Sequence, residues 1–197
     1  EAKMGDAARF VLSRKKLLEQ YHILEGLADA VSYSAKTNYE VARLLEQLTG
    51  CFFSLHSLES LGTVRDKKRV WFLAQAWDEK EIDSLLASGV ENFVVDNEAD
   101  LSTLTGCLKG KSARVSLLLR MRLRENTIHT GKHFAFGMRA ERVNMLIPEL
   151  RKNSSIARLG LHFHRKTQNV SEWSLKPELE ESISGDALKS MDYVCIG

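Results

Sequence analysis

The segment VSYSAKTNYEVARLLEQLTGCFFSL, residues 31–55, contains the repeating unit from which the fold is inferred. It opens with a short strand-like run and ends with the apolar run Cys51–Leu55. Between these runs, Val41, Leu44 and Leu45 recur at the three- and four-residue spacing of one helix face. Strand, helix and strand in this order predict a right-handed crossover unit of a parallel sheet.

The same alternation continues through the rest of the chain, so the fold class is α/β. The predicted strands cover Ala30–Ser34, Cys51–Leu55, Val70–Ala74, Asn92–Val95, Val115–Met121, Leu159–His164 and Tyr193–Ile196. The predicted helices cover Ser13–Leu27, Tyr39–Thr49, Glu59–Val64, Glu79–Ser88, Asp100–Cys107, Glu141–Lys152 and Gly185–Lys189.

Such a sheet can stay open and doubly wound, or it can close into a (β/α)8 TIM-type barrel. A dinucleotide-binding sheet usually carries a glycine-rich turn after its first strand, but residues 34–38 contain no glycine. The barrel is therefore favoured. Seven strands are one short of closure, and Gly197 falls at the end of the seventh. We expect one barrel domain over residues 1–197, truncated before its last strand.

Composition narrows the class of protein. Lys and Arg number 28 and Asp and Glu 26, and the net charge of +2 argues against nucleic-acid and membrane partners. Hydrophobic residues make up 44%, a globular value, and the longest apolar runs are far shorter than a membrane span. Cys51, Cys107 and Cys195 are too few and too far apart for a disulfide framework, so we expect a cytoplasmic location.

Candidate site residues stand where predicted strands end, because barrel enzymes place their chemistry at that edge. Lys36 follows the first strand and is either a Schiff-base lysine or a solvated one. His162 and His164 alternate along the sixth strand. They are a metal pair, a stacking or acid–base histidine, or core histidines. The metal pair is the weakest interpretation because no carboxylate follows closely, and no metal is expected.

Two further residues extend this edge. Arg120, near the end of the fifth strand, either orients an anion or aromatic face or forms an ion pair with a loop carboxylate. Gly197 follows the seventh strand, where bare backbone N–H groups of barrel loops commonly bind phosphate.

In chain order, these segments resemble the fold-type III pyridoxal-phosphate decarboxylases, the family of ornithine, diaminopimelate and biosynthetic arginine decarboxylases. That resemblance implies an alanine racemase-like barrel. The similar stretches are Arg9–Ser13 before the barrel, Val31–Asn38 with the pattern Y-x-x-K-x-N, Phe93–Asn97, Leu118–Arg120, Leu161–His164 with Thr167-Gln168, and Tyr193–Gly197 before a glycine-rich phosphate loop.

The resemblance implies pyridoxal 5′-phosphate as cofactor and decarboxylation of a basic or diamino amino acid. Lys36 would carry the internal aldimine and His164 would stack on the pyridine ring. Arg120 would lie beside the cofactor, Thr167 near its phosphate, and Gly197 would open the phosphate loop. The family works as a homodimer with a C-terminal β-domain, which this chain lacks, so we expect weak or no activity from residues 1–197 alone.

Several positions depart from the family pattern. Phe53 stands where ornithine decarboxylases have aspartate, and His56-Ser57 is closer to the carboxynorspermidine branch. Arg165-Lys166 makes the loop after His164 basic, and His133–Gly137 keeps only part of the S-K-F-G signature. Two alternatives therefore stay open: a catalytically inactive barrel that acts as a cofactor-binding or protein-interaction module, and an alanine-racemase-type isomerase.

Overall fold

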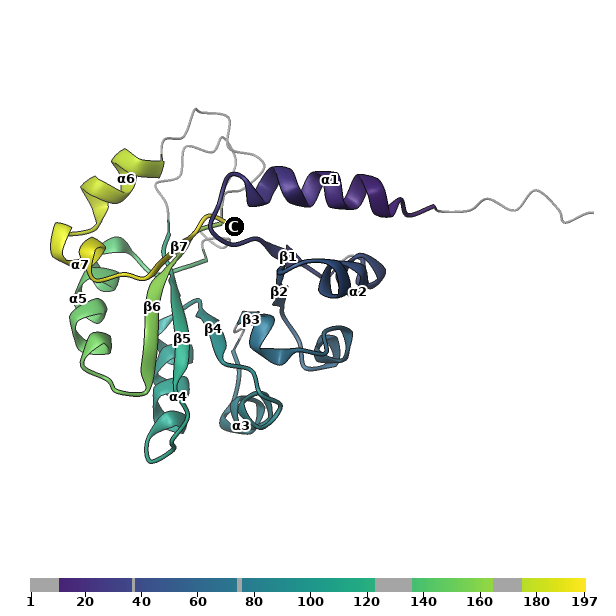
Figure 1. The fold of residues 1–197 in the computed structure, drawn as a ribbon. Helices are drawn as coiled ribbons and strands as arrows, with labels where there is room; N and C mark the ends of the chain where they lie inside the picture. Colours follow the sequence, from purple (N-terminus) through teal and green to yellow (C-terminus); the bar gives the residue numbers. More distant parts are fainter. Residues whose placement is uncertain (1–10, 37, 74–75, 123–135, 165–174) are drawn as a thin grey trace, which may run out of the picture.

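The computed structural model describes residues 11–36, 38–73, 76–122, 136–164 and 175–197. Their strands form one parallel sheet in chain order from β1 to β7. The sheet curls with helices on its outside (Figure 1). The strand bounds are β1 Ser32–Ser34, β2 Phe52–Leu55, β3 Val70–Leu73, β4 Asn92–Val95, β5 Val115–Arg120, β6 Ile156–His162 and β7 Tyr193–Cys195. The predicted truncated barrel is confirmed, and β6 begins three residues earlier than predicted.

The crossover helices follow the predicted order. Their bounds are α1 Arg14–Glu25, α2 Tyr39–Leu48, α3 Glu79–Ala87, α4 Glu98–Leu108, α5 Ala140–Arg151, α6 Leu175–Ser182 and α7 Gly185–Lys189. The helix predicted at Glu59–Val64 is wrong in type, because residues 59–63 form the 3-10 helix η1. A second 3-10 helix, η2 Lys67–Arg69, and α6 are not predicted. Among the described helices, none is long and apolar enough to cross a membrane.

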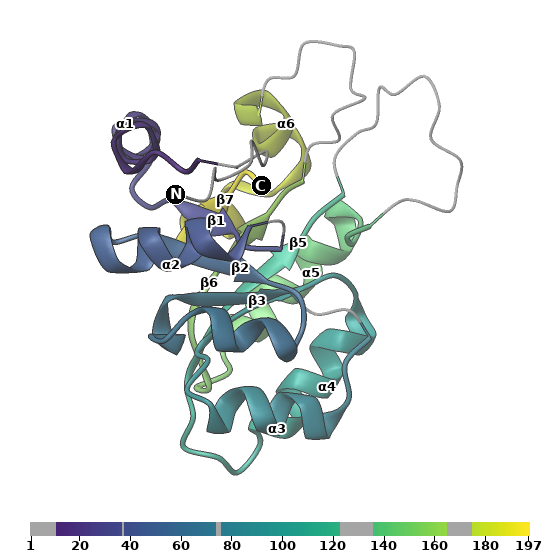
Figure 2. The ribbon, with the colours of Figure 1, turned by 90° about the vertical axis from the view of Figure 1, so that its right-hand side faces the viewer.

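Side-chain caps explain why several helices start where they do. Asn38 and Asn97 accept backbone N–H groups of the first turns of α2 and α4, which directly follow β1 and β4. A polar residue at the carboxyl end of a strand thus both ends the strand and begins the next helix. In Figure 2, α1 lies on α2, outside the ring of crossovers.

The outer face of the sheet packs under the helices and forms the core. Alternate strand residues point to this face. The largest fully buried side chains are aromatic and aliphatic: Phe53, Phe72, Phe93, Phe163, Leu55, Ile82, Leu85, Leu104, Leu108, Leu117, Leu119 and Ile147. This face holds the crossovers in place and orients the opposite face toward the barrel interior.

The inner face shows how far the sheet has curled. The ring centroids of Trp71 on β3 and Tyr193 on β7 are 5.9 Å apart, although these strands are not sheet neighbours. Gly160 on β6 makes room for this approach, because a Cβ there would overlap the carbonyl oxygen of Tyr193 and lie 2.9 Å from Leu118 Cδ2. Side chains of β3 and β7 therefore meet across the interior of the curled sheet.

Candidate functional site

Lys36 and His56 follow neighbouring strands at the edge that we call the mouth, the carboxyl ends of β1, β2, β5, β6 and β7. Ser34 is in register with Ser54, and the Ala35 N–H donates to Ser54 O at 3.3 Å, so the ladder continues past β1. That register places Lys36 level with His56, with Lys36 exposed and His56 half-buried. The first predicted site residue therefore lies at the mouth, as expected for a barrel site.

Arg120 and Asp96 form an ion pair at the ends of β5 and β4. Arg120 Nη1 lies 2.8 Å from Asp96 Oδ1, and the two side chains are only 17% and 20% exposed. The guanidinium also lies over the ring of Phe136, 4.9 Å from its centroid. The predicted ion pair with a loop carboxylate is confirmed. Because two partners hold the guanidinium, Arg120 presents a fixed cation to the mouth.

The chain crosses closely under Arg120. Met138 donates to the Arg120 carbonyl at 2.9 Å, and its own carbonyl accepts from Arg122 N at 2.8 Å. The preceding Gly137 has φ of +92°, and a Cβ there would lie 3.0 Å from Arg122 N. Only glycine accommodates this crossing without strain.

His162 is buried and bonded to a cysteine that sequence reasoning missed. His162 is in register with Arg120 on one side and Cys195 on the other. Its Nδ1 lies 3.2 Å from Cys195 Sγ. Burial, and then the nearby Arg120, lower the pKa of His162 to about 4. His162 is thus a buried, neutral histidine with one hydrogen-bonded ring nitrogen, which is nearest to the core-histidine interpretation.

His164 differs from His162, because β6 has ended and its side chain is exposed. Its pKa is lowered by partial desolvation, then by Arg120 and Lys36. Desolvation likewise lowers the pKa of His56, with further contributions from Lys36, Arg120 and His164. These residues are close enough to act on one another. The mouth's positive charge comes from Lys36 and from Arg120, which Asp96 partly neutralises, and the histidines add polar groups that can contact an anion. The sequence pattern did not single out His56 for chemistry.

Gly197 lies against the end of β6. Its φ is +92°, and a Cβ there would lie 2.8 Å from Phe163 O and 3.3 Å from His164 Cα. The chain therefore passes His164 with bare backbone. Thr167 lies outside the described residues, as do Arg165 and Lys166. Within the described part of the chain, no three His, Cys, Asp or Glu residues gather as metal ligands.

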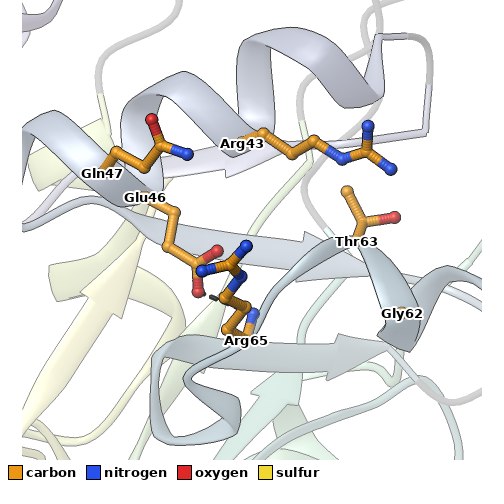
Figure 3. A pocket seen from close by; sticks show the side chains of 6 residues that line it. All are labelled: Arg43, Glu46, Gln47, Gly62, Thr63 and Arg65. Carbon is orange, nitrogen blue, oxygen red and sulfur yellow. Dashed lines mark hydrogen bonds between the residues drawn. The ribbon is translucent and has the colours of Figure 1, made fainter.

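Two other features lie away from the mouth. Phe53 is fully buried in the outer core, with the Arg69 guanidinium 5.2 Å from its ring centroid. Phe53, which stands where ornithine decarboxylases have aspartate, therefore lies in the core and not at the mouth. A cavity of about 260 Å³ between α2 and η1 is lined by Arg43, Glu46, Gln47, Gly62, Thr63 and Arg65 (Figure 3). The Glu46 carboxylate is occupied by the N–H groups of Arg65 and Asp66, so this cavity offers no nucleophile.

Comparisons with known proteins agree with this arrangement. The family described as pyridoxal-dependent decarboxylase, pyridoxal binding domain, matches residues 15–181. No curated protein sequence matches the chain.

Solved structures share the fold at low identity. Lysine decarboxylase from Selenomonas ruminantium is 20% identical with a TM-score of 0.64, over 80% of this chain and 42% of that one. Diaminopimelate decarboxylase from M. jannaschi is 20% identical with a TM-score of 0.67, over 87% and 45%. Lysine/ornithine decarboxylase from Vibrio vulnificus, complexed with cadaverine, is 23% identical with a TM-score of 0.60, over 79% and 41%. The chain thus spans less than half the length of these proteins.

Proposed function

The chain belongs to the pyridoxal-dependent decarboxylase family through the pyridoxal-binding domain, and on that premise we propose that it carries the cofactor site of an amino-acid decarboxylase in which Lys36 binds pyridoxal 5′-phosphate covalently. The family match makes pyridoxal phosphate the cofactor. The covalent role of Lys36, the identity of the substrate and the activity of the whole protein are parts of the proposal.

The described residues fit this cofactor. The mouth gathers Lys36, His56, Arg120 and His164, whose charges and dipoles favour a phosphate anion. Gly197 packs its bare backbone against Phe163 and His164, where a Cβ would overlap Phe163 O, and backbone without a side chain is what a phosphate-binding loop needs. The observation that carries the proposal is the position of Lys36, an exposed amine at the end of β1 and within this cationic mouth.

Each residue has a separate role in the proposal. When bound, pyridoxal phosphate supplies an electron sink for the charge left at Cα as CO2 departs. Lys36 tethers the cofactor, and His164 supplies a flat ring beside it. Arg120, held by Asp96, orients the cofactor through a fixed cation. Gly197 gives backbone access to the phosphate. The position of Thr167 near that phosphate stays a prediction.

We propose a basic or diamino amino acid as substrate. The similar structures are decarboxylases of lysine, ornithine and diaminopimelate by their names. Asp96, the carboxylate in direct contact with Arg120, is already paired. A second ammonium group of the substrate therefore has to bind a carboxylate elsewhere in the intact protein, and the predicted homodimer would be one source of it.

The first test is chemical trapping of Lys36. Incubation with pyridoxal phosphate followed by borohydride reduction and peptide mapping should label Lys36 in the intact protein. Lys36→Ala should abolish that label. Lys68→Ala, which removes an exposed lysine near the start of β3, should leave it unchanged. A wild-type protein whose label lies only on other lysines would overturn the assignment.

The second test separates the reactions. The intact protein should release CO2 from lysine, ornithine, diaminopimelate or arginine, and Lys36→Ala should release none. Racemisation of alanine without CO2 release would instead favour the isomerase. Labelling of Lys36 with neither reaction would favour the inactive cofactor-binding barrel.

A further inference from the structure

The contact between His162 and Cys195 joins the last two strands of the sheet at the mouth. The two residues are in register on β6 and β7, so their side chains point to the same, inner face. Sγ of Cys195 lies 3.2 Å from Nδ1 of His162, and His162 is 7% exposed. The family comparison assigns no role to this pair.

Both partners are neutral. Burial raises the pKa of the Cys195 thiol, with an opposing effect from the backbone N–H of Gly197. The pKa of His162 is lowered to about 4 by burial and by Arg120. Both shifts favour a neutral thiol beside a neutral imidazole over a thiolate–imidazolium pair. Imidazole nitrogen accepts hydrogen bonds better than thiol sulfur, so S–H donates to Nδ1 and the ring proton stays on Nε2.

Nε2 of His162 is the atom that remains for a ligand. It has no hydrogen-bond partner among the residues that the structure describes, and it is not one of their fully buried unpaired atoms. The titratable groups that act on His162 come from three other segments: Arg120 on β5, His164 after β6 and His56 after β2. A donor at Nε2 thus adds to a surface that already suits an anion.

We propose that Cys195 is a positioning residue: its thiol holds His162 in the tautomer that carries the proton on Nε2, and that N–H donates to an acceptor oxygen of the ligand at the mouth. The proposal rests on the proposed function for the identity of the ligand. The role of Cys195 in setting the tautomer does not depend on it.

The tautomer can be measured directly by ¹⁵N NMR of the intact, histidine-labelled protein, with His162→Gln to assign the signals. Wild type and Cys195→Ser, which keeps a donor, should show a protonated Nε2 and an unprotonated Nδ1. Cys195→Ala should show both tautomers. Cys195→Val, nearer the thiol in size, serves if the alanine variant does not fold. A wild-type proton on Nδ1, or a tautomer unchanged in both donor-free variants, would overturn the proposal.

The effect on binding is measured with pyridoxine 5′-phosphate, which has no aldehyde and so binds without reacting at Lys36. One weakened hydrogen bond should reduce its affinity for Cys195→Ala about three- to tenfold, and Cys195→Ser should bind like wild type. Equal affinity of all variants would refute the link between tautomer and ligand while leaving the cofactor assignment intact. Failure of wild type itself to bind would count against both the cofactor site and the ligand donor.

Discussion

The two faces of the curled sheet differ in the side chains that they carry. The outer face is a continuous apolar surface under the helices, with Phe53, Phe93 and Leu117 fully buried. The inner face is mixed: Ser54 and Asn92 lie in one row, the apolar Val94 and Leu118 lie in the next, and the last row ends at the mouth. The outer face therefore supplies stability, and the mouth at the end of the inner face carries the candidate site.

The difference predicts where substitutions matter for folding and where they matter for binding. On the outer face, side chains are exchanged only at the cost of a cavity or of strain. On the inner face, hydrogen bonds and ion pairs such as Arg120–Asp96 determine which groups point into the mouth.

The largest effect is expected on the outer face. Phe93 is fully buried and its ring meets Trp77 edge-on at 5.7 Å between centroids. Phe93→Ala should lower the free energy of unfolding by about 3 to 5 kcal/mol, through lost burial and the remaining cavity. Ser54→Ala, which breaks the 2.9 Å contact between the Ser54 and Ser32 hydroxyls, should cost about 1 kcal/mol. Denaturant unfolding measures both, and equal losses would contradict the division.

Sequence reasoning identifies most strands well, because short apolar runs mark β2 to β6. It also places Lys36, Arg120 and His164 at strand ends. It does not predict α6, since eight residues with Pro177 near their start offer few apolar positions. The Cys195–His162 contact and the position of His56 at the mouth are missed as well. Both depend on the register between strands, and periodicity within one strand carries no information about that register.

A second effect should appear on the inner face when the pH falls. Above pH 6.5, the ordinary value for histidine, His162 is neutral in both the folded and the unfolded chain. Between pH 6.5 and about 4 the unfolded chain binds a proton there and the folded chain does not, so folding loses stability as the pH falls. The full difference corresponds to about 3.4 kcal/mol, of which about 2 to 3 kcal/mol is lost between pH 7.5 and pH 4.5.

His162→Gln isolates this contribution, because the variant keeps His56 and His164 but loses the buried imidazole. The free energy of unfolding is measured at pH 7.5 and at pH 4.5 for wild type and variant. Its decrease between the two pH values should be about 2 to 3 kcal/mol larger for wild type. An equal loss of unfolding free energy in the two proteins would mean that burial beside Cys195 and Arg120 does not lower the pKa of His162.

The smallest effect concerns Gly160, where β6 and β7 pack closely on the inner face. A Cβ on Gly160 would overlap the Tyr193 carbonyl oxygen and lie 2.8 Å from Tyr193 Cβ. Both atoms are fixed by the backbone of the neighbouring strand β7. Because β7 cannot yield by rotating a side chain, Gly160→Ala should lower the free energy of unfolding by about 1 to 3 kcal/mol. Gly62→Ala in η1, where a Cβ meets nothing within 4 Å, should stay within about 0.5 kcal/mol of wild type in the same denaturant titration.

Since β7 carries Cys195, the Gly160 variant should also disturb the ¹⁵N signals of His162. A Gly160→Ala protein with wild-type stability and an unchanged His162 spectrum would show that the inner face is loosely packed even here, and that the sheet does not need a glycine to curl.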